Sequence, residues 1–307
     1  MPTAFLTHPL FKRHEVPAGH PECPERLSAI TDELITQHIY ELLAIVEAPA
    51  ASNDALCRVH APAYVSALES LVVDDKLVPL DPDTFVGSHS LAAARHAAGA
   101  AVEATNLVMA GHADNAFCCV RPPGHHAESD RAMGFCLFNN VAVGVAHALH
   151  QFGLERVAIL DFDVHHGNGT EEIFAGNDRV LLCSSFQHPF YPHSSVEPLG
   201  PNIVKVPFQA GCKGRQFRDE ISDHWAPAIE GFSPELIFVS AGFDGHVEDS
   251  MAGLSLVDDD YRWISEWIVA RAEKHAGGRV VSCLEGGYAL AALARCATLH
   301  VRALAGV

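Results

Sequence analysis

The stretch VAILDFDVHHGNG, residues 157–169, indicates the fold class most directly. It begins with a short continuous apolar run, and such runs are typical of strands buried on both faces of a sheet. Comparable runs recur along the chain at Ala4–Leu6, Leu42–Val46, Ala116–Val120, Val157–Leu160, Val180–Cys183, Ile203–Val206, Leu236–Val239 and Val280–Leu284.

Helical patterns lie between many of these runs, at Glu25–Ile39, Leu91–Met109, Asn140–Phe152, Arg215–Ile229, Asp258–His275 and Ala289–Ala303. Strands that alternate with helices predict an α/β fold, with one parallel sheet covered by helices on both faces. Because no linker, composition shift or internal repeat divides the 307 residues, we expect one domain over residues 1–307.

Composition narrows the function classes. With 49% hydrophobic and 19% charged residues the chain can bury a large core, and its net charge of -18 argues against nucleic-acid binding while permitting a cationic substrate. Nine cysteines without a CxxC pair predict neither a disulfide framework nor a thiolate zinc site, which favours a cytoplasmic location. No signal-peptide pattern and no apolar run of about 20 residues predict a protein that is neither secreted nor membrane-spanning.

Two acidic segments follow predicted strands. In LDFDVHHGNG, an extended chain would point Asp161, Asp163 and His165 to one side, and SAGFDGH places Asp244 at another strand end. Asp163, His165 and Asp244 would supply three N/O ligands and leave a fourth position for water or substrate, as a catalytic zinc site requires. An isolated DxDxH is often a helix cap or a solvated loop, so the interpretation depends on the repeated placement of such groups at strand ends.

The stretch RPPGHHAESD, residues 121–130, carries the adjacent His125 and His126 on a Pro-Gly loop. Histidine has a pKa near neutrality, so the pair is a candidate proton-transfer device, although a surface loop is the alternative in a chain with 20 histidines. In CLEGGY, two glycines allow Tyr288 to project over a site, and a core tyrosine is the alternative there.

Four motifs occur in order along the chain: VRPPGHHAESDRAMGFCLFNNVAV, LDFDVHHGNGTEEIF, SAGFDGH and CLEGGY. Together with HPECPERL and DPDTFVGSHSLAAARHAAGAAVEA they resemble the zinc-dependent histone deacetylase family, most closely its class II branch and bacterial amidohydrolase relatives. The similarity runs from His20 to Tyr288. It implies an arginase-deacetylase fold with about eight mostly parallel strands and a deacetylase activity on acyl-lysine-like amines.

The resemblance also implies roles for individual residues. His126 would be the general base and then the acid that protonates the leaving amine, while His125, hydrogen-bonded to Asp161, would tune the charge beside it. Tyr288 would donate to the developing oxyanion. Zinc, or iron(II), which the same ligand types accept, would be held by Asp163, His165 and Asp244.

By the same resemblance, Phe135 and Tyr191 would form two aromatic walls of a substrate tunnel, with Gly134 beside Phe135. Met251 would lie at the rim and Arg26 near an exit path for acetate. Structural potassium would be bound at two places, the first formed by Asp161, Asp163, His165, Ser184 and Ser185, and the second by Phe174, Asn177 and Val180. For the apolar members of these sets, core packing is the alternative.

Two positions discriminate between branches of the family. Asn168 agrees with class II, where class I enzymes carry aspartate, and Tyr288 is kept where the poorly active vertebrate class IIa enzymes carry histidine. An acetylated polyamine is the alternative substrate, but Met251 lacks the carboxylate of the polyamine-selective enzyme and therefore favours an acyl-lysine-like one.

Other functions fit the residues less well. An arginase-like dimetal enzyme needs further bridging carboxylates, and the residue two positions after Asp244 is His246. A non-catalytic binder would be expected to have lost a ligand, His126 or Tyr288. A homo-oligomer is left open.

Overall fold

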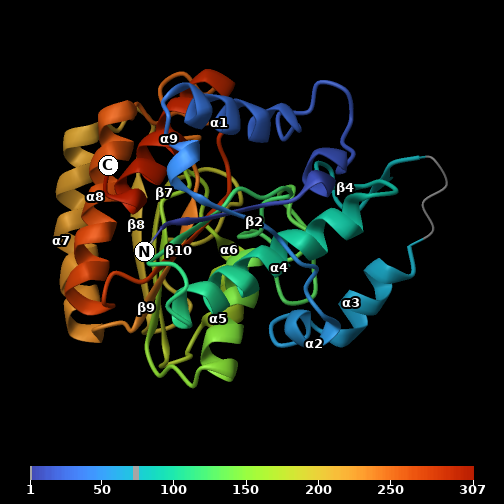
Figure 1. Cartoon of the computed structure of the whole chain (residues 1–307), viewed down its shortest axis with the longest axis horizontal. Coiled ribbons are helices and arrows are strands. Elements are labelled where there is room, and N and C mark those ends of the chain that lie inside the picture. Colours follow the sequence, from blue (N-terminus) through green and yellow to red (C-terminus); the bar gives the residue numbers. More distant parts are fainter. Residues whose placement is uncertain (1, 72–75) are drawn as a thin grey trace.

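The computed structural model describes residues 2–71 and 76–307 and has an eight-stranded sheet at its centre (Figure 1). The strand order is β2-β1-β5-β10-β9-β6-β7-β8, and every neighbouring pair is parallel. The strands are β1 (Ala4–Thr7), β2 (Ala44–Glu47), β5 (Ala116–Cys118), β6 (Val157–Asp161), β7 (Val180–Gln187), β8 (Ile203–Phe208), β9 (Leu236–Ala241) and β10 (Val280–Leu284). Each apolar run that the sequence predicts to be a strand is therefore one of the eight strands, and the predicted α/β class is confirmed.

Helices cover both faces of the sheet (Figure 1). On one face, the ring of Phe238 in β9 packs against Gly144 of α5 (Asn140–Gln151), which lies beside α4 (Ser90–Met109). On the other face, Ser282 of β10 bonds His300 of α9 (Leu290–Ala305) at 2.8 Å. The second layer also contains α1 (Glu25–Thr36) and α8 (Asp258–His275), both packed on α9, and α7 (Gly214–Phe232) along β7 and β8.

Some element bounds differ from those predicted. Strand β7 continues to Gln187 through polar Ser184 and Ser185, because β8 pairs with it along this whole length. Helix α1 ends at Thr36 rather than at Ile39, since His38 adopts a positive φ of 56°. A 3-10 helix, η2 (Tyr40–Leu42), takes the place of the start of the predicted strand Leu42–Val46.

Several short elements were not predicted because each is too short for a periodic pattern. They are η1 (Pro9–Arg13), α2 (Asn53–Leu56), α3 (Pro62–Glu69), α6 (Asn168–Phe174) and an antiparallel pair, β3 (Val78–Pro79) with β4 (Phe85–Val86). Helix α6 begins directly after the HHG of the stretch 157–169, so only the irregular residues 162–167 separate it from the end of β6.

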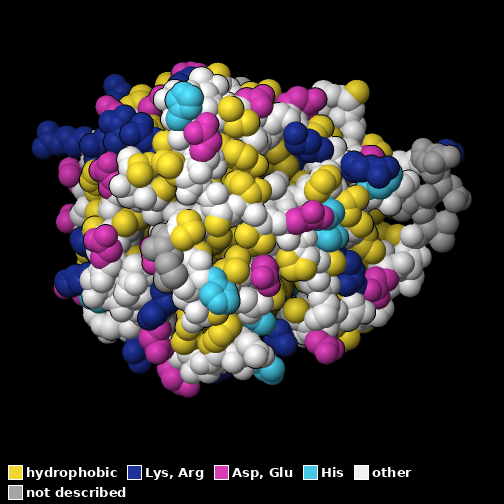
Figure 2. Space-filling view, in the orientation of Figure 1, with side chains coloured by type: hydrophobic (Ala, Val, Ile, Leu, Met, Phe, Trp, Pro, Cys, Tyr) yellow, Lys and Arg dark blue, Asp and Glu magenta, His cyan; other side chains and the backbone are white. Residues whose placement is uncertain are grey.

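The surface carries both signs of charge. On the face shown in Figure 2, Asp and Glu side chains lie among Lys and Arg, with hydrophobic side chains between them. The acidic excess is therefore not gathered into one patch on this face. Within the described ranges, no helix has the length and apolar character needed to cross a bilayer.

Candidate active site

Polar side chains gather where β5, β6, β9 and β10 end, and these four strands lie in the middle of the sheet. His125 and His126 follow β5, Asp163 and His165 follow β6, Asp244 follows β9 and Tyr288 follows β10. Parallel strands bring their carboxyl ends to one edge, which is why residues far apart in the sequence meet here.

Three side chains that could bind a metal, Asp163, His165 and Asp244, converge in a buried cluster. His165 Nδ1 lies 3.1 Å from Asp163 Oδ1 and 3.1 Å from Asp244 Oδ2. Backbone N–H groups fix the two carboxylates, since Gly286 N donates to Asp163 Oδ2 at 2.8 Å and Val164 N to Asp244 Oδ1 at 3.1 Å. Burial and the neighbouring Asp163 carboxylate raise the pKa of Asp244. A dication would relieve this concentration of buried negative charge, so the donor set fits zinc or iron(II).

The chain does not stay extended through this cluster, so the condition under which Asp161, Asp163 and His165 would all point to one side is not met. Strand β6 ends at Asp161, and the following residues bend because carboxylates accept from the backbone two residues on. Asp161 Oδ1 accepts from Asp163 N at 3.1 Å, and Asp163 Oδ1 accepts from His165 N at 2.8 Å. The bend separates the two aspartates, so that Asp161 faces His125 while Asp163 and His165 face Asp244.

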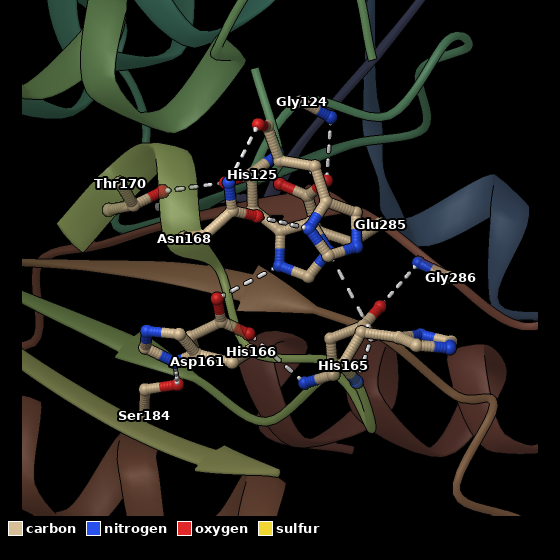
Figure 3. Close-up of polar contacts among 12 residues, drawn as sticks. Gly124, His125, Asp161, His165, His166, Asn168, Thr170, Ser184, Glu285 and Gly286 are labelled. Carbon is tan, nitrogen blue, oxygen red and sulfur yellow. Dashed lines mark hydrogen bonds and ion pairs between the residues drawn. The ribbon is translucent and has the colours of Figure 1, made fainter. Parts of the chain in front are cut away.

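The two adjacent histidines have different partners and different charge. His125 Nδ1 lies 2.9 Å from Asp161 Oδ2 (Figure 3). Burial opposes a charge on His125, but the carboxylates of Asp161 and Asp163 raise its pKa to about 10. Burial and the positive charge on His125 hold the pKa of His126 well below its usual value. The geometry therefore pairs a cationic imidazole with a neutral one.

The hydrogen bond between His126 and Asn168 determines which ring nitrogen of His126 carries the proton. Its Nδ1 lies 2.8 Å from Asn168 Oδ1, and a carbonyl oxygen can only accept, so Nδ1 carries the proton. Asn168 is held in turn, because its Nδ2 donates to Glu128 Oε1 at 2.8 Å. The lone pair of neutral His126 is therefore on Nε2. Sequence reasoning used Asn168 only to assign the branch of the family and missed this contact.

Another buried carboxylate supports the histidine loop. Glu285 Oε2 accepts from Gly124 N at 2.7 Å and from His125 N at 3.1 Å (Figure 3). Its burial raises its pKa to about 7. The residue belongs to the CLEGGY motif, but sequence reasoning considered only the two glycines and the tyrosine of this motif.

A cavity of about 220 Å³ opens onto this site. Of the residues that we expected to form a tunnel, Gly134, Phe135, Tyr191 and Met251 line it, together with the histidine pair, His165 and Tyr288. The lining residues that sequence reasoning missed are Asp83, Pro123, Phe190 and Gly286.

Aromatic rings shape the walls of the cavity. The ring of Phe135 meets that of Tyr288 edge-on at 5.8 Å, and Tyr191 meets His126 edge-on at 5.2 Å. Phe190 stacks on His165 with 5.4 Å between the ring centroids. Gly134, with a φ of +55°, lets the backbone pass close to the His126 ring, because a Cβ at this position would lie 2.5 Å from a carbon of that ring. The cavity is suited to an aliphatic chain.

Arg26 does not line the cavity. It is fully buried below Tyr288, with its guanidinium 4.9 Å from the centroid of the tyrosine ring. Its Nε donates to Gly287 O at 2.7 Å and another nitrogen donates to Glu285 O. Arg26 thus braces the backbone that carries Tyr288. Burial raises the pKa of the Tyr288 phenol well above its usual value, so the hydroxyl is a proton donor at neutral pH.

The residues expected to bind potassium fall into two groups. Near the first, Ser184 Oγ lies 2.8 Å from His166 Nδ1, and Ser184 pairs with Asp161 in the sheet. At the second, Asn202 Nδ2 donates to Phe174 O at 2.9 Å and to Val180 O at 2.8 Å, while Asn177 O accepts from Val180 N. The carbonyl oxygens of Phe174, Asn177 and Val180 therefore all accept hydrogen bonds from protein donors.

A second metal-capable group lies outside the cavity, formed by His246, Asp258 and Cys296. Arg295 donates from Nε to Asp258 Oδ2 at 2.7 Å, and His246 Nε2 lies 2.9 Å from Asp258 Oδ1. The guanidinium already balances the charge of this carboxylate. The group is therefore an ion-pair network on the described part of the chain, and we assign no metal to it.

Comparison with known proteins defines the class. A model of the histone deacetylase domain matches residues 20–304, and the chain belongs to the histone deacetylase family. Members of this family generally depend on zinc. The chain is 38% identical to the histone deacetylase-like amidohydrolase of Pseudomonas aeruginosa over 94% of this chain and 78% of that protein.

Two other relatives are similar over most of this chain. One is a probable deacetylase of Archaeoglobus fulgidus, 37% identical over 94% of this chain and 82% of that protein. The other is the polyamine deacetylase HDAC10 of Mus musculus, 35% identical over 93% of this chain and 45% of that protein. Among solved structures, the HDA15 HD domain matches 99% of this chain and 88% of its own, with a TM-score of 0.91 and 32% identity. The implied arginase-deacetylase fold is thereby confirmed.

Proposed function

We propose that residues 1–307 form one catalytic domain, a zinc-dependent amidohydrolase that removes acetyl groups from acetyl-lysine-like amines. The observation that carries the proposal is the convergence of Asp163, His165 and Asp244 beside a cavity whose walls include His126 and Tyr288. We propose that the three converging residues hold zinc. When bound there, zinc would polarise the amide carbonyl and acidify the attacking water.

The histidine pair would move the protons. Neutral His126 accepts the proton of the attacking water on Nε2, because its Nδ1–H is committed to Asn168. It then returns this proton to the amine nitrogen as the C–N bond breaks, which a poor amine leaving group requires. His125 stays protonated through its contact with Asp161 and keeps positive charge beside the reacting centre.

Tyr288 would stabilise the negative charge that develops on the carbonyl oxygen. Its hydroxyl stays protonated at working pH, and Arg26 holds both its ring and its backbone in place. A donor fixed before the reaction costs no reorganisation when the charge develops. Phe135 and Tyr191 would grip the aliphatic stem that leads from the cavity mouth to the amide.

An acetylated polyamine is the second candidate substrate, and one observation favours it. Asp83 lines the cavity, and burial together with the neighbouring Asp81 raises its pKa to about 6. This carboxylate could pair with a distant ammonium group of a polyamine, a role that Met251 cannot fill. It therefore weakens the preference for acyl-lysine that we drew from Met251 alone.

The decisive experiment measures kcat/KM of the zinc-loaded protein on an acetyl-lysine peptide and on an acetylated polyamine, with a chelator control. A preference for the peptide of more than about 10-fold supports the hypothesis that the substrate is an acyl-lysine. The reverse preference, reduced selectively by Asp83→Asn, supports the polyamine reading. Absent turnover, or turnover that a chelator does not affect, would contradict the amidohydrolase proposal itself.

A further inference from the structure

Asp249 lies in the loop between β9 and α8 and is 5% exposed. Its carboxylate accepts three backbone N–H groups from two separate segments. Oδ2 accepts from Tyr288 N at 2.6 Å and from Ala289 N at 2.9 Å, whereas Oδ1 accepts from Met251 N at 2.9 Å. One buried side chain thus joins the segment of the phenol to the rim of the cavity.

The segment of Tyr288 needs such support because it has no regular secondary structure. Residues 285–289 lie between β10 and α9, and Gly287 adopts a φ of +118°. Arg26 donates hydrogen bonds to two carbonyl oxygens of this segment, those of Glu285 and Gly287. Asp249 accepts hydrogen bonds from the next two N–H groups, those of Tyr288 and Ala289. Arg26 therefore holds the segment through its carbonyl oxygens, and Asp249 holds it through its N–H groups. Together they fix the backbone position from which the Tyr288 side chain extends.

We propose that Asp249 is a positioning residue that fixes the backbone of Tyr288, the oxyanion donor, through the same carboxylate that holds Met251 N at the rim of the cavity. The inference rests on the proposed function for the role of Tyr288. A plain helix cap is the competing account, since Ala289 is the N-cap residue of α9. A cap would contribute to stability but would not act specifically through the phenol.

Kinetics in two backgrounds separate these accounts. Asp249→Ala removes all three acceptor contacts, and we expect kcat to fall by about 10-fold to 100-fold with KM changed less than about threefold, because small misplacements of catalytic groups have effects of this size. In a Tyr288→Phe background the same substitution should change kcat by less than about twofold, since there is no phenol left to position.

Two further variants complete the set. Asp249→Asn keeps the shape of the side chain, but its amide nitrogen must face either Met251 N or the N–H pair of Tyr288 and Ala289, so we expect a smaller loss of kcat. This variant also tests the proposal should the alanine variant fail to fold. Glu248→Gln is the matched control, because this neighbouring carboxylate pairs with Arg295 at 2.7 Å and not with the tyrosine segment. Its kcat should match that of the unmodified protein.

Amide hydrogen exchange provides a readout that does not depend on turnover. We expect the amides of Met251, Tyr288 and Ala289 to exchange faster in both Asp249 variants, with no change in the Glu248→Gln variant and full protection retained in β10. Unchanged exchange at Tyr288, or a loss of kcat that persists in the Tyr288→Phe background, would overturn the proposal. If the unmodified protein hydrolyses no acylated amine, the proposed function fails, while the exchange experiment still tests whether Asp249 holds the segment.

Discussion

Replacing Asn168 with aspartate should move the acidic limb of the pH profile upwards. The side chain keeps its size, but the neutral oxygen 2.8 Å from His126 Nδ1 becomes part of a carboxylate. An opposite charge at this range raises a histidine pKa by roughly 1 to 3 units, equivalent to about 1.4 to 4 kcal/mol. Because the base must be neutral to accept a proton, a raised pKa of His126 means that the acidic limb of kcat/KM appears at higher pH.

The structure also identifies what could mask this shift. Asn168 Nδ2 donates to Glu128 Oε1 at 2.8 Å, so the new carboxylate would place an oxygen against another carboxylate. We therefore expect the full shift in the double variant Asn168→Asp, Glu128→Gln, and a smaller one in Asn168→Asp alone. Glu128→Gln by itself keeps Asn168 and should leave the limb in place.

The assay is kcat/KM on one acylated substrate from about pH 5 to about pH 9, with zinc content and circular dichroism measured for each variant. A double variant that is folded and fully metallated, yet keeps the acidic limb of the unmodified protein, would refute the assignment of His126 as the base. It would also show that the contact with Asn168 does not control the proton affinity of that imidazole.

Three further substitutions test other parts of the site. Tyr288→Phe should lower kcat by about 100-fold to 1,000-fold with little change in KM, measured by steady-state kinetics, and unchanged turnover would exclude the phenol as an oxyanion donor. Gly286→Ala should abolish zinc binding in a folded protein, as judged by metal analysis and circular dichroism, because a methyl group would overlap Asp244 Oδ2 and Asp163 Oδ2. Phe135→Ala should raise KM for an acyl-lysine peptide by about 10-fold or more through lost apolar burial, and an unaltered KM would show that the wall does not contact substrate.

The sequence was most informative where one physical cause dominates. Strands buried on both faces need apolar side chains throughout, so β6 and β9 could be recognised from composition alone. The polar end of β7 could not, because Ser184 and Ser185 interrupt the apolar pattern although both are buried and paired with β8.

In the candidate site, too, the sequence indicates some residues and does not reveal the contacts of others. Asp163 and His165 lie in one motif and Asp244 in another, but all three follow predicted strands, and a single sequence displays that placement. The contacts of Asp83 and Asp249 depend on how loops from distant parts of the chain pack together, and no local pattern encodes that. The direction in which Asn168 faces is likewise a property of the assembled loops.

The sheet order has a consequence for how the chain reaches its native state. Strand β10 is the last of the eight along the chain, yet it lies between β5 and β9 near the middle of the sheet. During synthesis the final sheet therefore cannot be completed before residues 280–284 are available to pair with β5 and β9. The ligands on the loops after β6 and β9 reach their final support only at that step, when Gly286 arrives to bond Asp163. Metal capture should thus be a late event that reports completion of the whole sheet.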